Sequence, residues 1–230
     1  MRYSISLGFI AFMSAALASS AAAQDTPHLE RIEWTDVWVT GADQDDLPRV
    51  LLVGDSIVRG YYDVVDKALE GKAHCARYTT SLFMGNPDFL AELRVLLQRY
   101  RFDVIHFNNG LHGWAYSEEE YAASISPVLD CIAEYAKDAK FVWAATTPVR
   151  NASDLAIFDE KNPRVIERNR IAAEVTKTRG IPVNDLYALV ESHTEYFSKD
   201  GVHFSEQGRT VLGEQVAKTI AGLLPESSTQ

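Results

Sequence analysis

The stretch "RVLLVGDSIVRGYY", residues 49–62, places a lone serine directly after a run of branched apolar residues and an acid. Residues 50–53 are apolar without alternation, which predicts a strand buried on both faces, as in a parallel sheet. The positions that follow have a helical period, and Gly71 stands where the C-terminal cap of that helix belongs. Ser56 is therefore expected at a strand-to-helix turn, the place where ligands bind in open α/β sheets.

This turn gives Ser56 two interpretations. Asp and Ser are preferred N-cap residues, so the turn by itself favours a capping role. A helix start also offers free N–H groups to a developing anion, which suits the nucleophile of an acyl-transfer enzyme. Residues elsewhere in the chain must decide between the two.

Strands and helices alternate along the rest of the chain. The apolar patterns predict further strands at residues 72–80, 102–107, 140–148 and 181–186. They predict further helices at residues 87–100, 117–140, 163–180 and 205–224. Pro127 should kink or restart the second of these helices. Alternation of this kind implies right-handed β-α-β crossovers and a parallel sheet.

The first 23 residues have the features of a secretory signal peptide. An apolar stretch follows Arg2, and small residues before position 24 fit cleavage near Ala23. The apolar stretch is shorter than the roughly 20 residues of a membrane-spanning helix, so stable membrane insertion is not expected. We expect residues 24–48 to form an N-terminal arm that is a short edge strand or a packing segment, residues 49–224 the main domain, and residues 225–230 a frayed tail.

The chain is acidic. Its 230 residues carry a formal net charge of −10 at pH 7, which becomes −11 when the signal peptide, with one arginine and no acid, is removed. An acidic exported protein is a poor partner for nucleic acid or an anionic membrane. The two cysteines, Cys75 and Cys131, are as compatible with a disulfide as with two buried thiols.

A histidine near the C-terminus supplies the second part of a candidate site. In "SKDGVHFSEQG", Asp200 precedes His203 by three positions, in a glycine-containing turn that leads into the last helix. One turn can present both side chains in the same direction, so that one ring nitrogen of His203 meets Asp200 and the other faces Ser56. A serine hydrolase needs this set: a nucleophile, an imidazole that takes its proton, and a carboxylate that fixes the tautomer of the imidazole.

The sequence resembles the SGNH (GDSL-type) hydrolase family at two blocks. "VLLVGDSI" is similar to the first block, with Ser56 as nucleophile, and "DGVHF" is similar to the last block, with Asp200 and His203. The "GxSxG" motif of the α/β-hydrolases does not occur. The resemblance runs from about residue 33 to the last helix. It implies a three-layer α/β/α sandwich with a central, mostly parallel five-stranded sheet, the flavodoxin-like SGNH hydrolase fold.

The resemblance also implies an oxyanion hole, although the middle blocks differ from the family pattern. The second block supplies a glycine N–H, for which Gly85 in "SLFMGNPDFL" is the candidate beside the N–H of Ser56. The third block supplies an asparagine amide, where this chain has "HFNNGLHGW". A branch of the family with "HWN-x-GLWD" is similar and favours Asn108, with Asn109 as the alternative. Alignment on the glycine instead puts His112 at the asparagine position.

Three side chains are candidates for substrate contacts. Tyr62, Trp114 and His112 stand next to the predicted catalytic turns, where aromatic faces can stack on sugar rings or line an acyl pocket. Packing inside the protein is the alternative for the aromatic residues. No set of His, Cys, Asp and Glu residues has metal-ligand spacing, so neither a metal nor an organic cofactor is expected.

These residues predict an exported serine esterase, periplasmic or extracellular, that acts through an acyl-enzyme on a small-molecule or glycan ester. Removal of acetyl groups from glycans, as many members of the family perform, is the favoured reaction. A lipase, lysophospholipase or thioesterase of the same family is one alternative, and a non-catalytic glycan-binding module is another. The sequence leaves the oligomeric state open.

Overall fold

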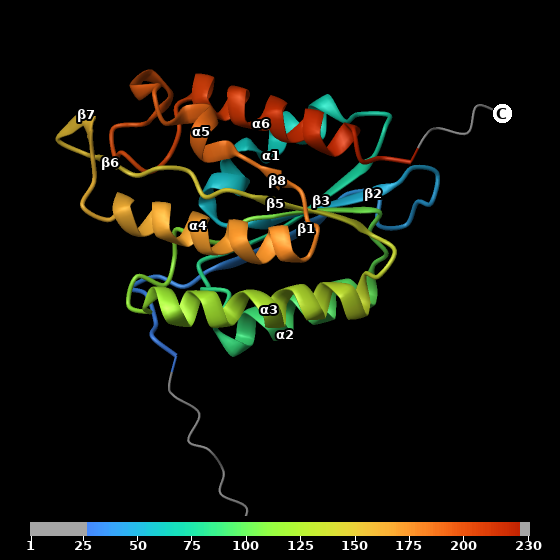
Figure 1. The fold of residues 1–230 in the computed structure, drawn as a ribbon. Coiled ribbons are helices and arrows are strands. Elements are labelled where there is room, and N and C mark those ends of the chain that lie inside the picture. The colour runs from blue at the N-terminus through green and yellow to red at the C-terminus, as the bar shows by residue number, and fades with distance from the viewer. Residues whose placement is uncertain (1–26, 226–230) are drawn as a thin grey trace, which may run out of the picture.

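The central feature of the fold is a six-stranded sheet (Figure 1). The computed structural model describes residues 27–225, so the signal peptide predicted at residues 1–23 and the end of the tail, residues 226–230, lie outside the described residues. The strands follow the order β1-β3-β2-β4-β5-β8, and every neighbouring pair except β1 with β3 is parallel. They are β1 (Thr35–Val39), β2 (Arg49–Gly54), β3 (His74–Thr80), β4 (Val104–Phe107), β5 (Lys140–Ala144) and β8 (Val183–Asn184).

The sheet is mostly parallel, as predicted, but it has six strands and not five. The sixth strand is β1, so the N-terminal arm forms the short edge strand that was one of its two predicted structures, and it pairs with β3 in a register that places Thr35 opposite Thr80. Trp34 extends the pairing, because its carbonyl accepts hydrogen bonds from the Ser81 N–H and the Thr80 hydroxyl, each at 3.0 Å. The arm thus covers an edge of β3 whose backbone groups would otherwise be unpaired.

Helices cover both faces of the sheet, which gives three layers (Figure 1). One face carries α1 (Ser56–Ala68), α5 (Leu186–Val190) and α6 (Glu206–Ala221), and the other carries α2 (Pro87–Arg99), α3 (Glu118–Tyr135) and α4 (Asn162–Thr178). All of β2 is buried, with Val50 and Leu52 in the core under α1 and α6, and Leu51 and Val53 in the core under α2 and α3. The predicted α/β/α sandwich is therefore confirmed, with β2 near its centre.

α3 is one continuous helix through Pro127, so the expected restart at this proline does not occur. A capping box formed by Ser117 and Glu120 begins the helix. Ile125 and Val128, which flank the proline, are fully buried in the core under α2 and α3. This packing keeps both halves of the helix on the sheet although the proline removes a backbone donor.

Cys75 on β3 and Cys131 on α3 are both free and buried. Cys75 belongs to the core under α1 and α6, and Cys131 belongs to the core on the other side of the sheet. Burial, assisted by the negative charge of Asp66, raises the pKa of Cys75 to about 12. The two thiols are therefore separate and inert, which settles the alternative that the sequence left open.

Gly54 ends β2 and leaves no room for a side chain. A Cβ at this position would lie 2.1 Å from Cγ2 and 3.0 Å from Cβ of Val58, a buried residue of α1. We expect Gly54→Ala to lower the free energy of unfolding by about 1–3 kcal/mol, because the added methyl group pushes α1 away from the sheet. Urea denaturation followed by circular dichroism measures this change. In the matched control Gly222→Ala the new Cβ meets nothing closer than 3.6 Å, and equal midpoints for the two variants would contradict the expectation.

Candidate active site

The N-cap of α1 is Asp55, which leaves Ser56 free for another role. The Asp55 carboxylate accepts a hydrogen bond from the Ile57 N–H at 2.9 Å, and the helix begins at Ser56. The side chain of Asp55 is fully buried, and this burial raises its pKa. As the first residue of the helix, Ser56 has no intrahelical partner for its N–H. The turn therefore presents a hydroxyl and a backbone donor together at the carboxyl end of β2.

A tight turn before α6 holds Asp200 and His203 on one side. The Ser198 N–H donates to the His203 carbonyl at 2.8 Å, and Gly201 has a φ of +73°, a conformation that favours glycine. The turn rests on a hairpin made of β6 (Arg150–Asn151) and β7 (Asp154–Phe158). The Arg150 N–H donates to the Gly201 carbonyl at 2.7 Å, and a Cβ on Gly201 would lie 2.1 Å from the Arg150 carbonyl oxygen. The hairpin therefore fixes the position of the turn.

Ser56, His203 and Asp200 form a continuous chain of hydrogen bonds. His203 Nε2 lies 2.9 Å from Ser56 Oγ, and His203 Nδ1 lies 2.7 Å from Asp200 Oδ2. Asp200 Oδ1 accepts from the N–H groups of Val202 and His203 at 2.9 Å each, and from the Ser198 hydroxyl at 2.8 Å. Burial raises the pKa of Asp200, but these hydrogen bonds outweigh it and hold the pKa well below its ordinary range. Asp200 is therefore an ionised acceptor, which leaves His203 Nε2 to accept from the serine hydroxyl.

A cleft of about 360 Å³ opens at Ser56 and His203. It is lined by Ser56, Ile57, Arg59, Gly60, Asp63, His203, Phe204 and Arg209. Two arginines and an aspartate give the cleft charged groups, beside the apolar side chains of Ile57 and Phe204. Such a lining suits a substrate rich in hydroxyl or acidic groups better than a long acyl chain.

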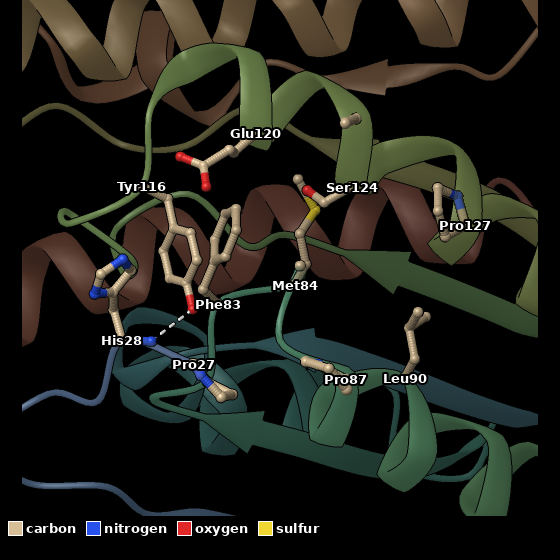
Figure 2. Close-up of a pocket in the computed structure, with 12 residues that line it drawn as sticks. Pro27, His28, Phe83, Met84, Pro87, Leu90, Tyr116, Glu120, Ser124 and Pro127 are labelled. Carbon is tan, nitrogen blue, oxygen red and sulfur yellow. Dashed lines mark hydrogen bonds between the residues drawn. The ribbon is translucent and has the colours of Figure 1, made fainter. Parts of the chain in front are cut away.

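A larger cavity of about 560 Å³ lies between the β3–α2 loop and α3 (Figure 2). Its lining is mostly apolar and shares no residue with the cleft at Ser56. Gly85 lines this cavity, and a Cβ on it would meet the Phe83 ring at 2.5 Å and Ser124 at 3.1 Å. Gly85 is not among the residues that line the cleft at Ser56, and its role as an oxyanion donor stays a prediction.

The two asparagines after β4 use their amide groups elsewhere. The Asn108 amide donates to the Ala144 carbonyl at 2.8 Å and to the Thr146 hydroxyl at 3.2 Å, so both of its hydrogens are engaged. The Asn109 amide donates to the Leu82 carbonyl at 2.9 Å, and its oxygen accepts from a backbone N–H of the same loop at 3.2 Å. These contacts tie the end of β4 to its neighbours and engage both amide hydrogens of Asn108 and one of Asn109.

Tyr62 and Trp114 are engaged in packing. Tyr62 is buried in α1, and its hydroxyl donates to the Cys75 carbonyl at 3.0 Å. The guanidinium groups of Arg168 and Arg164 lie 4.7 and 5.5 Å from the centre of the Trp114 ring. Neither aromatic residue lines the cleft at Ser56. The structure thus does not place these two predicted substrate contacts at the cleft.

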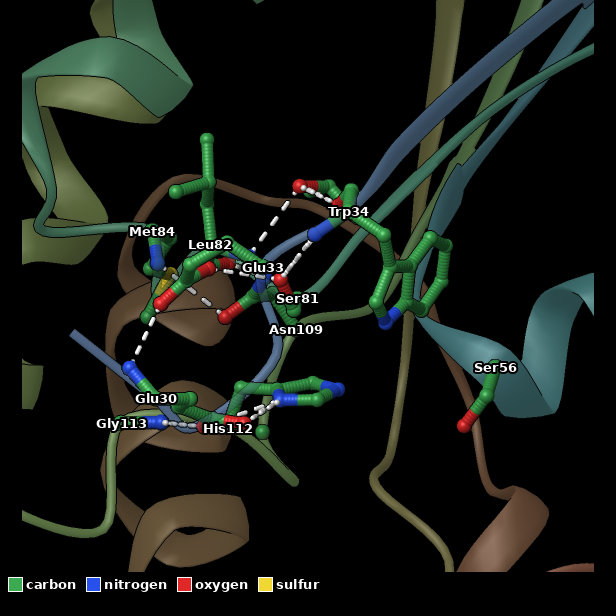
Figure 3. Close-up of polar contacts among 12 residues, drawn as sticks. Glu30, Glu33, Trp34, Ser56, Ser81, Leu82, Met84, Asn109, His112 and Gly113 are labelled. Atoms are coloured by element: carbon green, nitrogen blue, oxygen red, sulfur yellow. Dashed lines mark hydrogen bonds and ion pairs between the residues drawn. The ribbon is translucent and has the colours of Figure 1, made fainter.

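His112 points toward Ser56, and its partner comes from the N-terminal arm (Figure 3). Its Nδ1 lies 3.0 Å from both carboxylate oxygens of Glu30. The Trp34 ring stands edge-on to the His112 ring at 6.5 Å between centroids, and the Arg59 guanidinium lies 4.6 Å from the centre of the Trp34 ring. Glu30 and Trp34 thus belong to the surroundings of the site. No local sequence signal indicates this, because Glu30 precedes His112 by 82 positions.

Two other histidines have structural contacts away from Ser56. His106 is fully buried in β4, where burial lowers its pKa to about 3, and its Nε2 lies 3.2 Å from the Asn184 amide. His74, at the start of β3, pairs with Asp46 at 2.8 Å. Within residues 27–225, no group of three or more His, Cys, Asp or Glu side chains is arranged to hold a metal ion.

Solved structures that share the fold of this chain include a GDSL-like lipase and an SGNH hydrolase, so the likeness shows the fold of the SGNH (GDSL-type) hydrolases. An aryl esterase from M. smegmatis is 16% identical with a TM-score of 0.66, over 77% of this chain and 100% of that chain. A lipase/acylhydrolase from Enterococcus faecalis is 19% identical with a TM-score of 0.60, over 79% and 100%. A carbohydrate acetylesterase from Sinorhizobium meliloti is 13% identical with a TM-score of 0.64, over 77% and 100%. No family model and no curated protein matches the sequence of this chain.

Proposed function

We propose that the protein is a serine esterase that hydrolyses carboxylic esters through an acyl-enzyme. The observation that carries this proposal is the unbroken hydrogen-bond chain from Ser56 through His203 to Asp200, which opens onto a cleft. Ser56 Oγ attacks the ester carbonyl carbon while His203 Nε2 takes the hydroxyl proton, and ionised Asp200 stabilises the imidazolium. His203 then gives this proton to the leaving alcohol as the ester C–O bond breaks. Water, deprotonated by His203, attacks the acyl-enzyme, which releases the carboxylic acid and restores Ser56.

The substrate class that we propose is an acetylated carbohydrate. The cleft at Ser56 is bordered by Arg59, Asp63 and Arg209, which can hydrogen-bond to the hydroxyl groups of a sugar. One of the proteins that share the fold is a carbohydrate acetylesterase. An acetyl group needs no long apolar groove, and the apolar cavity of this protein does not share a wall with the cleft.

Two other functions make different demands on this site. A lipase, lysophospholipase or thioesterase needs an acyl groove beside Ser56, and the residues that line the cleft do not form one. A non-catalytic glycan-binding module does not need a histidine within 2.9 Å of the serine hydroxyl or an aspartate held by four donors. The acetylesterase function therefore has the stronger support.

We also propose that the protein is exported, to the periplasm or the extracellular space. The support is the sequence of residues 1–23, in which an apolar stretch is followed by small residues. Among the residues that the structure describes, no helix is both long and apolar enough to cross a membrane. Mass spectrometry of the mature N-terminus after secretion tests the proposed cleavage near Ala23.

Hydrolysis of p-nitrophenyl acetate, butyrate and octanoate, together with acetate release from an acetylated polysaccharide, tests the proposed function. We expect the acetyl esters to be cleaved fastest, and Ser56→Ala to lower kcat by about 10⁴-fold or more. Ser153→Ala, in the exposed turn of the β6–β7 hairpin, is the matched control and should keep the wild-type rate. Faster cleavage of octanoate would favour the lipase alternative. Absence of any hydrolysis, or equal rates for wild type and Ser56→Ala, would reject the nucleophile assignment and favour the binding module.

A further inference from the structure

We propose that His112 donates a hydrogen bond from Nε2 to the oxyanion that forms when Ser56 attacks the ester, in the role that an asparagine amide has in SGNH hydrolases. This inference rests on the proposed esterase function and deepens it. It adds a catalytic residue from the loop between β4 and α3, and a positioning residue, Glu30, from the N-terminal arm.

The orientation of the His112 ring is the first support. Glu30 holds Nδ1 with both carboxylate oxygens at 3.0 Å, and the other ring nitrogen faces Ser56 (Figure 3). Nε2 has no hydrogen-bond partner among the described residues and is not sealed from solvent. The His112 side chain is 16% exposed. A ring fixed at one nitrogen with its other nitrogen open toward the nucleophile has the geometry of a preorganised donor.

The backbone that carries His112 is also fixed. Arg168, fully buried on α4, donates to the carbonyl oxygens of Gly110, His112 and Gly113 at 3.0, 2.8 and 3.0 Å. The Gly113 N–H donates to Glu30 at 3.2 Å, so the same carboxylate binds both the ring and the loop. Glu30 thus holds the ring of His112, and Arg168 holds its backbone. A histidine that only faces solvent would not need these contacts.

The asparagine alternatives make hydrogen bonds elsewhere, Asn108 with both amide hydrogens and Asn109 with one. Both hydrogens of the Asn108 amide have acceptors, and Asn109 spans the β3–α2 loop with its amide nitrogen and oxygen. Beside the N–H of Ser56, His112 thus offers a ring nitrogen that faces the nucleophile and has no partner among the described residues.

The protonation state of His112 decides whether it can donate. Burial raises the pKa of Glu30, but the hydrogen bond and charge of His112 outweigh it and lower the pKa below the ordinary range, so Glu30 is a carboxylate. Nδ1 must therefore carry a hydrogen, and Nε2 carries a second one only in the imidazolium. Burial lowers the pKa of His112, but Glu30 and the charges of Asp55 and Glu33 outweigh it and raise the pKa above its ordinary value.

The charged and titratable groups around His112 come from several elements. They are Glu30 and Glu33 of the arm, Asp55 of the β2–α1 turn, Arg168 of α4, Lys161 near Glu30, and His203 across Ser56. The acids favour the imidazolium, and Arg168 contacts the backbone carbonyl and not the ring. His112 must keep its second proton to act as donor, so kcat should fall as the pH rises through the raised pKa of His112.

Profiles of kcat against pH test this inference, with acetate release from p-nitrophenyl acetate as the readout and the Ser56→Ala rate as background. His112→Ala should lower kcat by about 10²–10³-fold with little change in KM. His112→Asn restores an amide donor that does not titrate, so kcat should stay within about tenfold of wild type and the fall at high pH should disappear. Glu30→Gln removes a negative charge that lies beside the His112 ring and favours the imidazolium. The fall of kcat at high pH should therefore move to lower pH by about one unit.

The controls separate this inference from the proposed function. His74→Asn changes a histidine that pairs with Asp46 at the start of β3, away from Ser56. It should leave the profile of kcat against pH unchanged. A His112→Ala kcat within threefold of wild type, or an unchanged alkaline fall in His112→Asn, overturns the role of His112 while Ser56-dependent hydrolysis remains. Loss of Ser56 dependence in the wild type overturns the esterase function instead. If circular dichroism shows that His112→Ala does not fold, His112→Asn and Glu30→Gln decide the question.

Discussion

Asp200→Asn is expected to lower kcat for acetyl ester hydrolysis by about 10⁴-fold, with KM nearly unchanged. The Asp200 carboxylate accepts the Nδ1 hydrogen of His203 at 2.7 Å, so Nε2 is left without a hydrogen and can accept from Ser56. An asparagine can place its NH₂ group toward Nδ1, which then must act as an acceptor. The hydrogen of the neutral ring moves to Nε2, and His203 can no longer take the serine proton. Steady-state kinetics with p-nitrophenyl acetate measures the loss.

Ser198→Ala is the matched control for Asp200→Asn. It removes one donor, the hydroxyl at 2.8 Å from Asp200 Oδ1, and keeps the carboxylate and the two backbone donors at 2.9 Å. We expect a loss of kcat of no more than about tenfold, because the tautomer of His203 is unchanged. An Asp200→Asn enzyme that retains a tenth of the wild-type kcat would contradict the role given to this carboxylate.

The pH dependence of Asp200 follows from its lowered pKa. Because the folded protein holds the pKa below the unfolded value, the carboxylate stabilises the fold at pH values above the ordinary range of an aspartate. This stabilisation is lost only as the pH falls through the lower value of the folded state. The side chain is half exposed, so solvent screening keeps the contribution small. Asp200 is therefore still ionised in mild acid.

The sequence predicts most of the sheet because its strands are buried on both faces. An uninterrupted apolar run such as residues 50–53 identifies β2, and the helices between the strands follow from their apolar period. The sixth strand, β1, has no such run, since its side chains are partly exposed and its stability comes from backbone pairing with β3. Of the two expectations for Pro127, the restart is wrong, because tertiary packing on the sheet holds both halves of α3 in one helix.

The candidate site divides in the same way between local and long-range features. Asp200 and His203 share one turn, so their spacing is visible in the sequence, and the family resemblance links them to Ser56 over 147 positions. The contact of His112 with Glu30 spans 82 positions in a region without any repeating pattern. Tyr62 is near Ser56 in the sequence but lies on the buried side of α1. A residue close to Ser56 along the chain therefore need not line the cleft.

Arg168→Met is expected to lower the free energy of unfolding by about 3–5 kcal/mol. The Arg168 side chain is fully buried, donates to three backbone carbonyls of the loop after β4, and lies 3.4 Å from Glu118. A methionine can fill much of the volume of the arginine side chain, but it leaves the three backbone carbonyls buried without a donor. This unsatisfied burial is costly. Arg168→Lys should also be destabilised, because one ammonium cannot reproduce the fork of a guanidinium. Urea denaturation gives the change for each variant.

Arg170→Met on the same helix is the matched control for Arg168→Met. Arg170 forms two ion pairs, with Glu167 and Glu174, but its side chain is 53% exposed, so its loss should leave the stability nearly unchanged. Equal stabilities of the two methionine variants would show that the buried guanidinium does not hold the loop. Because Arg168 binds the carbonyl of His112 itself, Arg168→Lys should also lower kcat at a temperature where the variant is folded, and Arg170→Met should not. If Arg168→Lys loses stability but keeps its kcat, Arg168 stabilises the fold and does not position His112 for catalysis.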